Sequence, residues 1–128
     1  MEEIKAGGIT FTLDLSKPLW EQVLHQIRGA LARSDLQPGE KIPSLRDLAQ
    51  QLKINPNTVM RAYQELERDG LTETRRGQGT FITSSQQKIS EVRNLLAEDA
   101  VKAFVQEMRV LGLRKPEADN LLEEAKWE

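Results

Sequence analysis

The spacing of hydrophobic residues along the chain predicts a short strand followed by an amphipathic helix. Apolar and polar residues alternate from Ile9 to Leu15, which is typical of a half-buried strand. Pro18 suits a first helical turn, because no intrahelical N–H bond is lost there. The helix after Pro18 has an apolar stripe made of Leu19, Trp20, Val23, Leu24, Ile27 and Leu31. Farther along the chain, residues 41–43 are too few for more than a minimal strand.

Two further helical stretches are short and lie close together in the sequence. Ser44 can cap the first of them, with Asp47 placed as in a capping box. Asn55 can cap the second, Pro56 suits its first turn, and Gly70 supplies a terminator. Two short helices joined by a few residues predict a helix-turn-helix.

A glycine-rich hairpin is expected directly after these helices. Residues 71–76 and 80–83 are rich in Thr, Leu, Phe and Ile, and they flank Gly77-Gln78-Gly79. A hairpin in this position is a wing. The predicted fold class is therefore mainly α with a small β-hairpin: a winged helix-turn-helix domain followed by a C-terminal helical tail.

The rest of the chain has the pattern of one long helix and one short helix. A helix from Gln86 to Val110 would be roughly 37 Å long at ~1.5 Å per residue, which is too long for the preceding domain to cover. Gly112 interrupts the pattern, and a final helix is expected from Pro116 to Trp127. Its expected inward-facing residues are Ala118, Leu121, Leu122 and Ala125.

We therefore expect residues 1–83 to form a winged helix-turn-helix DNA-binding domain and residues 84–128 to form a helical dimerisation segment. The apolar surface of the long helix that the first domain cannot cover would pack against the same surface of a second copy, in a homodimer with two-fold symmetry. Such a dimer would place its recognition helices one DNA turn, ~34 Å, apart on a palindromic operator. The expected dimerisation residues are Ile89, Val92, Leu96, Val101, Phe104, Met108, Leu111, Leu121 and Leu122.

Charge and composition restrict the possible functions. The net charge of −2 is unlike the basic surplus of a typical nucleic-acid binder, yet residues 41–64 carry four basic side chains against one acidic, 4 − 1 = +3. The sequence has no cysteine, one histidine and no nucleotide-binding or nucleophile motif, so we expect no metal, cofactor or enzymatic activity. It lacks a signal-peptide pattern and any apolar run near ~20 residues, so we expect a cytoplasmic protein.

The second short helix offers a hydrogen-bonding face opposite its apolar stripe. Asn57, Thr58 and Arg61 lie toward its N-terminal end, where a recognition helix enters the major groove, and are the best candidates for reading bases. Tyr63 and Trp20 lie on inward-facing stripes and are expected to be core aromatics.

Other elements can contribute contacts with the DNA backbone. Arg46 can reach a phosphate or a groove edge, and Arg75 and Arg76 can follow the backbone or enter the minor groove. Orphan amides at the starts of the two short helices can also hold phosphates. The full set of expected DNA-binding residues is Ser44, Arg46, Asn55, Asn57, Thr58, Arg61, Gln64, Arg75, Arg76, Gly77, Gln78 and Gly79.

Two other interpretations compete with DNA binding. A polar helix face is by default merely solvated. DNA binding is favoured here because several features follow one another in the order a winged helix needs: cap, turn, Asn-Pro helix start, polar face and Arg-rich wing. A winged helix can instead mediate protein contacts, which the net charge favours slightly. Phosphate contacts predict an affinity that falls steeply with salt, and this separates the two.

Several motifs resemble the GntR family of bacterial repressors over residues 18–83. They are Pro43-Ser-Leu-Arg-Asp-Leu-Ala, Asn55-Pro-Asn-Thr-Val59, Ala62-Tyr63, Leu66-Glu-Arg-Asp-Gly-Leu71 and Arg76-Gly-Gln-Gly-Thr-Phe81. The Asn-Pro-Asn-Thr-Val start and the short helical tail resemble the YtrA subfamily, whose members are typically small dimeric repressors, often of transporter operons.

The resemblance implies a homodimeric repressor that binds double-stranded operator DNA. By this resemblance Arg46, Asn57, Thr58 and Gly77 match positions that contact the operator. The chain departs from the family pattern at Pro56 and Met60, where many members carry arginine.

Overall fold

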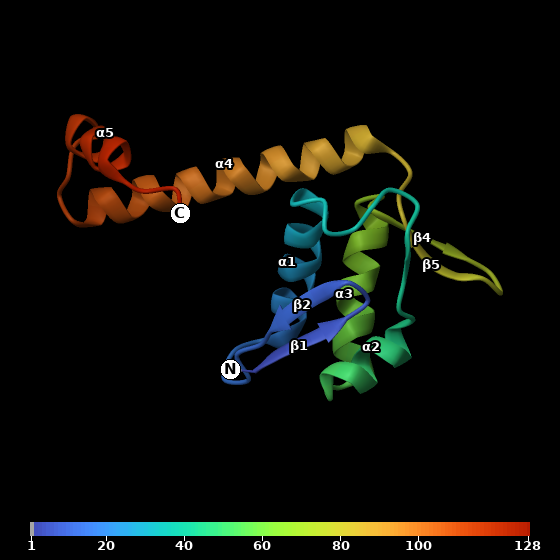
Figure 1. The fold of residues 1–128 in the computed structure, drawn as a ribbon. Helices are drawn as coiled ribbons and strands as arrows, with labels where there is room; N and C mark the ends of the chain where they lie inside the picture. Colours follow the sequence, from blue (N-terminus) through green and yellow to red (C-terminus); the bar gives the residue numbers. More distant parts are fainter. Residues whose placement is uncertain (1) are drawn as a thin grey trace. The chain divides into compact units, whose positions relative to one another are not determined.

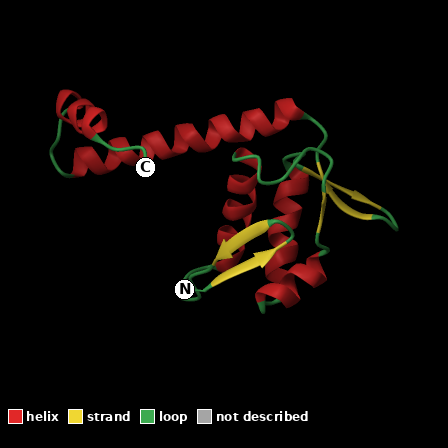
Figure 2. Cartoon of the chain, in the orientation of Figure 1, coloured by secondary structure: helices red, strands yellow, loops and turns green. Residues whose placement is uncertain are grey.

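The computed structural model describes residues 2–128, which form five helices and five short strands (Figures 1 and 2). The chain divides into two compact units, Met1–Arg93 and Asn94–Glu128, and the boundary lies inside one long helix. The elements in order are β1 (Glu3–Ala6), β2 (Ile9–Thr12), α1 (Leu19–Ala32), β3 (Lys41–Ile42), α2 (Leu45–Leu52), α3 (Pro56–Arg68), β4 (Thr72–Arg75), β5 (Gly79–Ile82), α4 (Gln86–Val110) and α5 (Lys115–Glu124).

Three helices build the core of the first unit, and α3 packs against both α1 and α2. The apolar stripes predicted for these helices are confirmed over most of their length, since Ile27 of α1, Leu48 of α2 and Leu66 of α3 are almost fully buried. At the start of α1, Leu19 and Trp20 are only half-buried. Each such side chain stabilises the fold by about 1.5–3 kcal/mol through removal of its surface from water. The core therefore holds α3 by one face and leaves its other face to solvent.

The helix ends confirm the predicted helix-turn-helix. The Ser44 hydroxyl accepts a hydrogen bond from the Asp47 amide at 3.1 Å, which is the serine half of the expected capping box. The Asn55 side chain accepts one from the Asn57 amide at 2.8 Å, and Pro56 lies in the first turn of α3. Between the helices, Lys53 adopts a left-handed conformation with φ of 56°, which turns the chain.

The wing is a three-stranded antiparallel sheet in the order β3-β5-β4. Arg75 pairs with Gly79 at the end of the β4–β5 ladder, and Lys41 of β3 pairs with Phe81. Gly77 and Gly79 have φ of 77° and 123°, conformations that favour glycine. The minimal strand expected at residues 41–43 thus becomes the outer strand of the wing sheet.

A second hairpin lies at the N-terminus, where the sequence pattern predicts a single strand. β1 pairs with β2 from Glu3↔Thr12 to Ala6↔Ile9. The expected strand from Ile9 to Leu15 is too long, because β2 ends at Thr12 and the side chain of Leu15 is 78% exposed. The structure therefore corrects both the number of strands and the end of β2.

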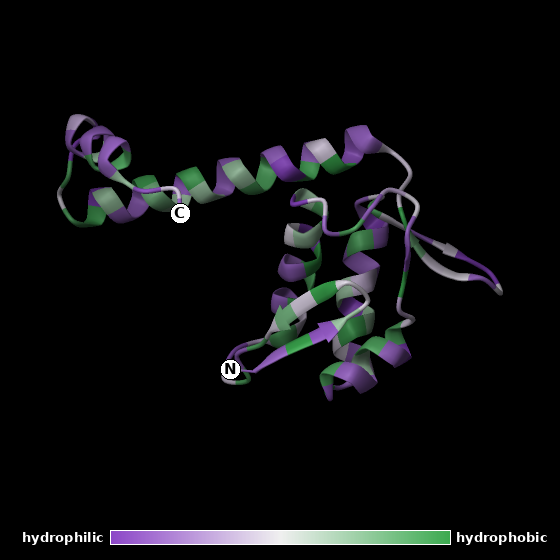
Figure 3. Cartoon of the chain, in the orientation of Figure 1, coloured by the Kyte–Doolittle hydropathy of each residue, from purple (hydrophilic) through white to green (hydrophobic). Residues whose placement is uncertain are grey.

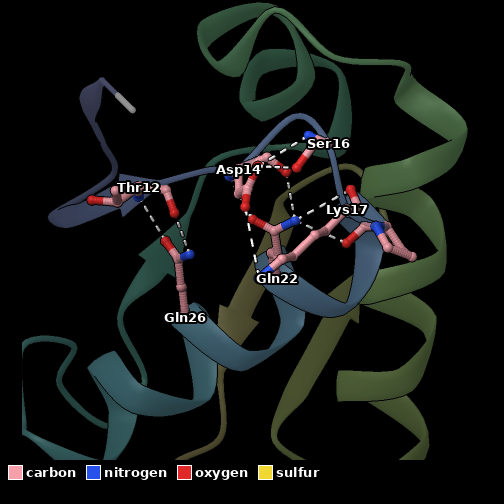
Figure 4. Close-up of polar contacts among 7 residues, drawn as sticks. Thr12, Asp14, Ser16, Lys17, Gln22 and Gln26 are labelled. Atoms are coloured by element: carbon pink, nitrogen blue, oxygen red, sulfur yellow. Dashed lines mark hydrogen bonds and ion pairs between the residues drawn. The ribbon is translucent and has the colours of Figure 1, made fainter.

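Two glutamines of α1 attach this hairpin to the helical core (Figure 4). The Gln26 amide donates to the Thr12 carbonyl at 2.7 Å and accepts from the Thr12 amide at 2.8 Å. Gln22 does the same with Asp14, at 2.9 Å and 2.7 Å. These side chains satisfy backbone groups that a further strand would otherwise pair.

The long helix α4 has the bounds that its hydrophobic period predicts. Its first turns belong to the first unit, where Ile89 and Val92 are buried. None of the side chains described between residues 94 and 128 is buried, although hydrophobic residues recur along α4 and α5 (Figure 3). None of the described helices has the length and apolarity needed to cross a bilayer.

The last helix differs from its prediction in two respects. α5 spans Lys115–Glu124 and does not reach Trp127, whose side chain is 98% exposed. Leu121 and Leu122, expected to face inward, are about half exposed at 51% and 56%. Little of the described chain packs against α5, so its apolar stripe is not covered.

Candidate nucleic-acid interface

The outward face of α3 carries the polar side chains that the helical wheel places there. Asn57, Arg61 and Gln64 are exposed, whereas Val59 and Ala62 are fully buried. Thr58 is half-buried at the start of the helix. The buried stripe fixes the rotation of α3, so the hydrogen-bonding face is presented to solvent along the first turns.

Arg61 does not point freely away from the core. Its guanidinium carbon lies 3.9 Å from the centre of the Trp20 ring, in a cation–π contact between α3 and α1. Trp20 is only half-buried, so the prediction that it is a core aromatic is wrong. It lies at the start of α1, where neighbouring elements cover the helix less completely than at its centre.

Tyr63 behaves as predicted and joins α3 to the start of α2. It is buried, and its hydroxyl donates a hydrogen bond to the Pro43 carbonyl at 2.7 Å, one residue before the Ser44 cap. Burial raises the pKa of the Tyr63 phenol far above its ordinary value, and the nearby Asp47 carboxylate adds to this. The phenol therefore remains a neutral hydrogen-bond donor.

Arg46 and Gln64 line one groove between α2, α3 and the wing sheet. The groove has a volume of about 370 Å³, and Met60 and Thr80 also line it. Arg46 is exposed in the first turn of α2. Ser44 also lines the groove, so the fold brings together three expected DNA-binding side chains, two from the start of α2 and one from α3.

The wing presents its arginines in different ways. Arg75 is half-buried over the Phe81 ring, 4.0 Å from its centre, and its Nε lies 3.6 Å from a Glu73 carboxylate oxygen. Arg76, Gly77 and Gln78 are exposed at the tip. Arg75 therefore stiffens the hairpin, while the tip residues are open to solvent.

Gly79 lies at the turn end of the β4–β5 ladder, next to the side chain of Lys41 on β3. A Cβ atom at this position would lie 2.8 Å from the Cε atom of Lys41 on β3. The end of the flexible Lys41 side chain can move aside, so the positive φ of Gly79 is what favours glycine at this position. Gly77 has open space around it, and there too the positive φ favours glycine.

A helix-turn-helix followed by a wing, with an exposed polar face on its second helix, defines a DNA-binding winged-helix protein. The family described as bacterial regulatory proteins, gntR family, matches residues 19–82. The chain belongs to this GntR family of transcriptional regulators, and the fold class predicted from the sequence is confirmed.

Relatives with similar sequences are transcriptional regulators, not enzymes. An uncharacterized HTH-type transcriptional regulator, YhcF of Bacillus subtilis, is 47% identical over 80% of this chain and 84% of its own length. The HTH-type transcriptional repressor YtrA of the same organism is 35% identical over 77% of this chain and 76% of its own.

Two solved structures with the same fold are named as GntR-family regulators. A GntR family transcriptional regulator from Listeria monocytogenes has a TM-score of 0.82 at 32% identity and covers 89% of this chain and 100% of its own. YtrA from Sulfolobus acidocaldarius, a GntR-family transcription factor, has a TM-score of 0.57 at 30% identity and covers 74% and 97%. These likenesses support the resemblance to the YtrA subfamily.

Proposed function

We propose that the protein is a sequence-specific repressor that binds a palindromic operator as a homodimer. The observation that carries the proposal is the exposed polar face of α3, held by a buried stripe and two helix caps and flanked by the wing. A relative named as a repressor, YtrA of Bacillus subtilis, supports the direction of regulation. Such a repressor acts in the cytoplasm, where the bacterial chromosome lies.

We assign the DNA contacts to three elements. Asn57 and Thr58, in the first turn of α3, are proposed to read base edges in the major groove, which their position near the helix N-terminus supports. Arg46 at the start of α2 and Arg76 at the wing tip are exposed cations suited to phosphates. Asn55 acts through its cap, because its side chain accepts a hydrogen bond from one backbone amide of the first turn of α3. The other amides of that turn, which have no partner within the helix, are available to bind a DNA phosphate.

The homodimer is proposed to form through the second unit, residues 94–128. α4 and α5 border an open apolar cleft of about 710 Å³, which Val101, Phe104 and Met108 line. Exposed apolar surface of this extent on a 35-residue helical pair favours burial against a second copy. Ile89 and Val92 are not part of this proposal, because their side chains are already buried in the first unit.

Selection of bound duplexes from a random oligonucleotide pool tests the proposal. We expect a recovered palindrome whose half-sites are spaced by about one turn of DNA, ~34 Å. Affinity for this palindrome should fall steeply with salt. In a plot of the logarithm of the binding constant against the logarithm of the salt concentration, the slope should be about −0.9 per phosphate contacted. If the purified protein binds no duplex at low ionic strength, the proposal is wrong.

Two variants that each remove one side-chain amide test the base-reading role of α3. Asn57→Ala should weaken binding to the selected site by about 1–3 kcal/mol and relax the preference at one base pair. Gln87→Ala, at an exposed position of α4 in the first unit, should leave affinity unchanged. Equal losses on the selected site and on random DNA would make Asn57 a backbone contact.

A further inference from the structure

Arg61 contacts Trp20 without the acidic partner that accompanies the other arginine contacts described in the first unit. Arg28 pairs with Asp69, Arg68 with Glu65 at 3.3 Å, and Arg75 with Glu73. Among residues 2–128, Arg61 has no acidic partner within ion-pair distance, and its recorded contact is the Trp20 ring. Its positive charge is therefore held in place without being neutralised.

Stacking leaves the hydrogen-bonding capacity of the guanidinium intact. The aromatic ring covers one flat face of the group, whereas its five N–H donors lie in the plane and point outward from the edge. A stacked arginine can therefore still donate two parallel hydrogen bonds to a phosphate or a base edge. Its flexible side chain also loses less freedom when it binds, because the stack has already ordered it.

We propose that Trp20 of α1 is a positioning residue of the DNA interface, which holds the Arg61 guanidinium with its donor edge toward the duplex. This inference rests on the proposed function, because it requires that Arg61 contacts DNA. It extends the interface to α1, an element outside the helix-turn-helix and the wing. Arg61 lies one turn after Asn57 on the exposed face of α3, so both side chains can reach the same groove.

A purely structural role for the pair fits the observations less well. α1 and α3 are already joined by fully buried apolar side chains, among them Val23 and Val59. An aliphatic side chain at position 61 would cover the Trp20 ring without bringing an unpaired charge. The arginine adds donors that no described residue of the protein accepts.

A double-mutant cycle on affinity for the selected operator tests the inference. Arg61→Ala should weaken binding about tenfold or more, and Trp20→Ala about threefold to tenfold. In the Arg61→Ala background, Trp20→Ala should cause no further loss, and Trp20→Phe should retain most of the affinity. Leu15→Ala is the control, because this large apolar side chain is 78% exposed in the first unit and lies outside the proposed DNA and dimer contacts, so its affinity should be unchanged.

Tryptophan fluorescence supplies a readout that needs neither DNA nor the Trp20→Ala variant. The chain has two tryptophans, so the Trp127→Phe protein reports Trp20 alone. Its emission should change when Arg61 is replaced by alanine, because the stacked cation is removed. An unchanged spectrum would mean that the stack does not form in solution and would overturn the inference.

The affinity outcomes separate this inference from the function on which it rests. If the unmodified protein binds its operator but the two substitutions act additively, Trp20 does not act through Arg61 and only the inference fails. If the unmodified protein binds no duplex, both fail. Thermal unfolding of each variant gives a temperature at which all are folded, so that differences in affinity are not differences in stability.

Discussion

At the scale of single residues, the side chains with the clearest chemistry are those that join two elements. Tyr63 is the single tyrosine of the chain, and its hydroxyl bonds the Pro43 carbonyl just before the Ser44 cap. The sequence pattern predicts that Tyr63 is buried but not which carbonyl it bonds, because that partner lies 20 residues away. Trp20 shows the opposite case, since helical spacing alone cannot tell a covered position from one at the end of a stripe.

We predict that the Tyr63 hydroxyl stabilises the fold and that this contribution is lost in alkali. Tyr63→Phe should lower the free energy of unfolding by about 0.5–1.5 kcal/mol, the usual net value of one hydrogen bond. Because the folded pKa is raised above the unfolded value of 10.0, the contribution is present below pH 10 and declines as pH rises beyond it. Denaturant melts of both proteins at pH 7 and above pH 10 measure this.

The phenol absorbance supplies an independent check on Tyr63. While the protein is folded, no phenolate signal should appear near the ordinary pKa of 10.0. A phenolate that titrates at this pH in the native protein would contradict the buried hydrogen bond.

A second residue-scale prediction concerns the turn between α2 and α3. Lys53 holds a left-handed conformation that costs an ordinary L-residue roughly 1–2 kcal/mol, whereas glycine adopts it readily. Lys53→Gly should therefore raise the free energy of unfolding by about 1 kcal/mol. Lys53→Ala is the control and should give no gain, because alanine keeps the steric conflict. Equal stability of the two variants would refute the explanation.

At the scale of elements, the helices follow from local sequence and the sheets largely do not. The caps at Ser44 and Asn55 and the start of α4 at Gln86 are predictable, because capping and hydrophobic period act within a few residues. β1 is missed because a four-residue strand shows too little alternation to distinguish it from a loop. Its hairpin packs against α1 through β2 and against α2 through β1.

We predict that the two hydrogen bonds of Gln26 help to attach the N-terminal hairpin to α1. Gln26→Met keeps a similar size but leaves the amide and carbonyl of Thr12 without their partner, which should cost about 1–3 kcal/mol. Gln51→Met, at an exposed position of α2, should change stability little. Hydrogen exchange gives the local test: the Thr12 amide should lose protection in the first variant, and retained protection would show that the clamp is dispensable.

At the scale of the whole molecule, the second unit has no buried core of its own among the described residues. None of its described side chains is buried, and its helices expose Val101, Leu111 and Leu122 among others. The sequence predicts the excess apolar surface from the length of α4. It does not predict that Ile89 and Val92 are buried in the first unit, because burial depends on which element packs against each turn of the helix.

We predict that Phe104→Asp releases monomers. A carboxylate in the α4–α5 cleft would have to be desolvated in a dimer, at a cost that a partly apolar interface does not repay. Leu15→Asp is the matched control, because Leu15 is 78% exposed in the first unit and should leave the dimer intact. Analytical ultracentrifugation distinguishes the two, and an unchanged sedimentation mass for Phe104→Asp would exclude this interface.

The sequence by itself determined the helix-turn-helix, the wing and the face of α3 that meets solvent. Caps, turn glycines and hydrophobic periods are encoded within short segments, so each can be recognised without the rest of the chain. Only the tertiary structure decided that a second hairpin is clamped to α1, that Arg46 and Gln64 share a groove, and that Arg61 lies on Trp20. These contacts join segments distant in the sequence, and their geometry depends on how the helices pack rather than on any local pattern.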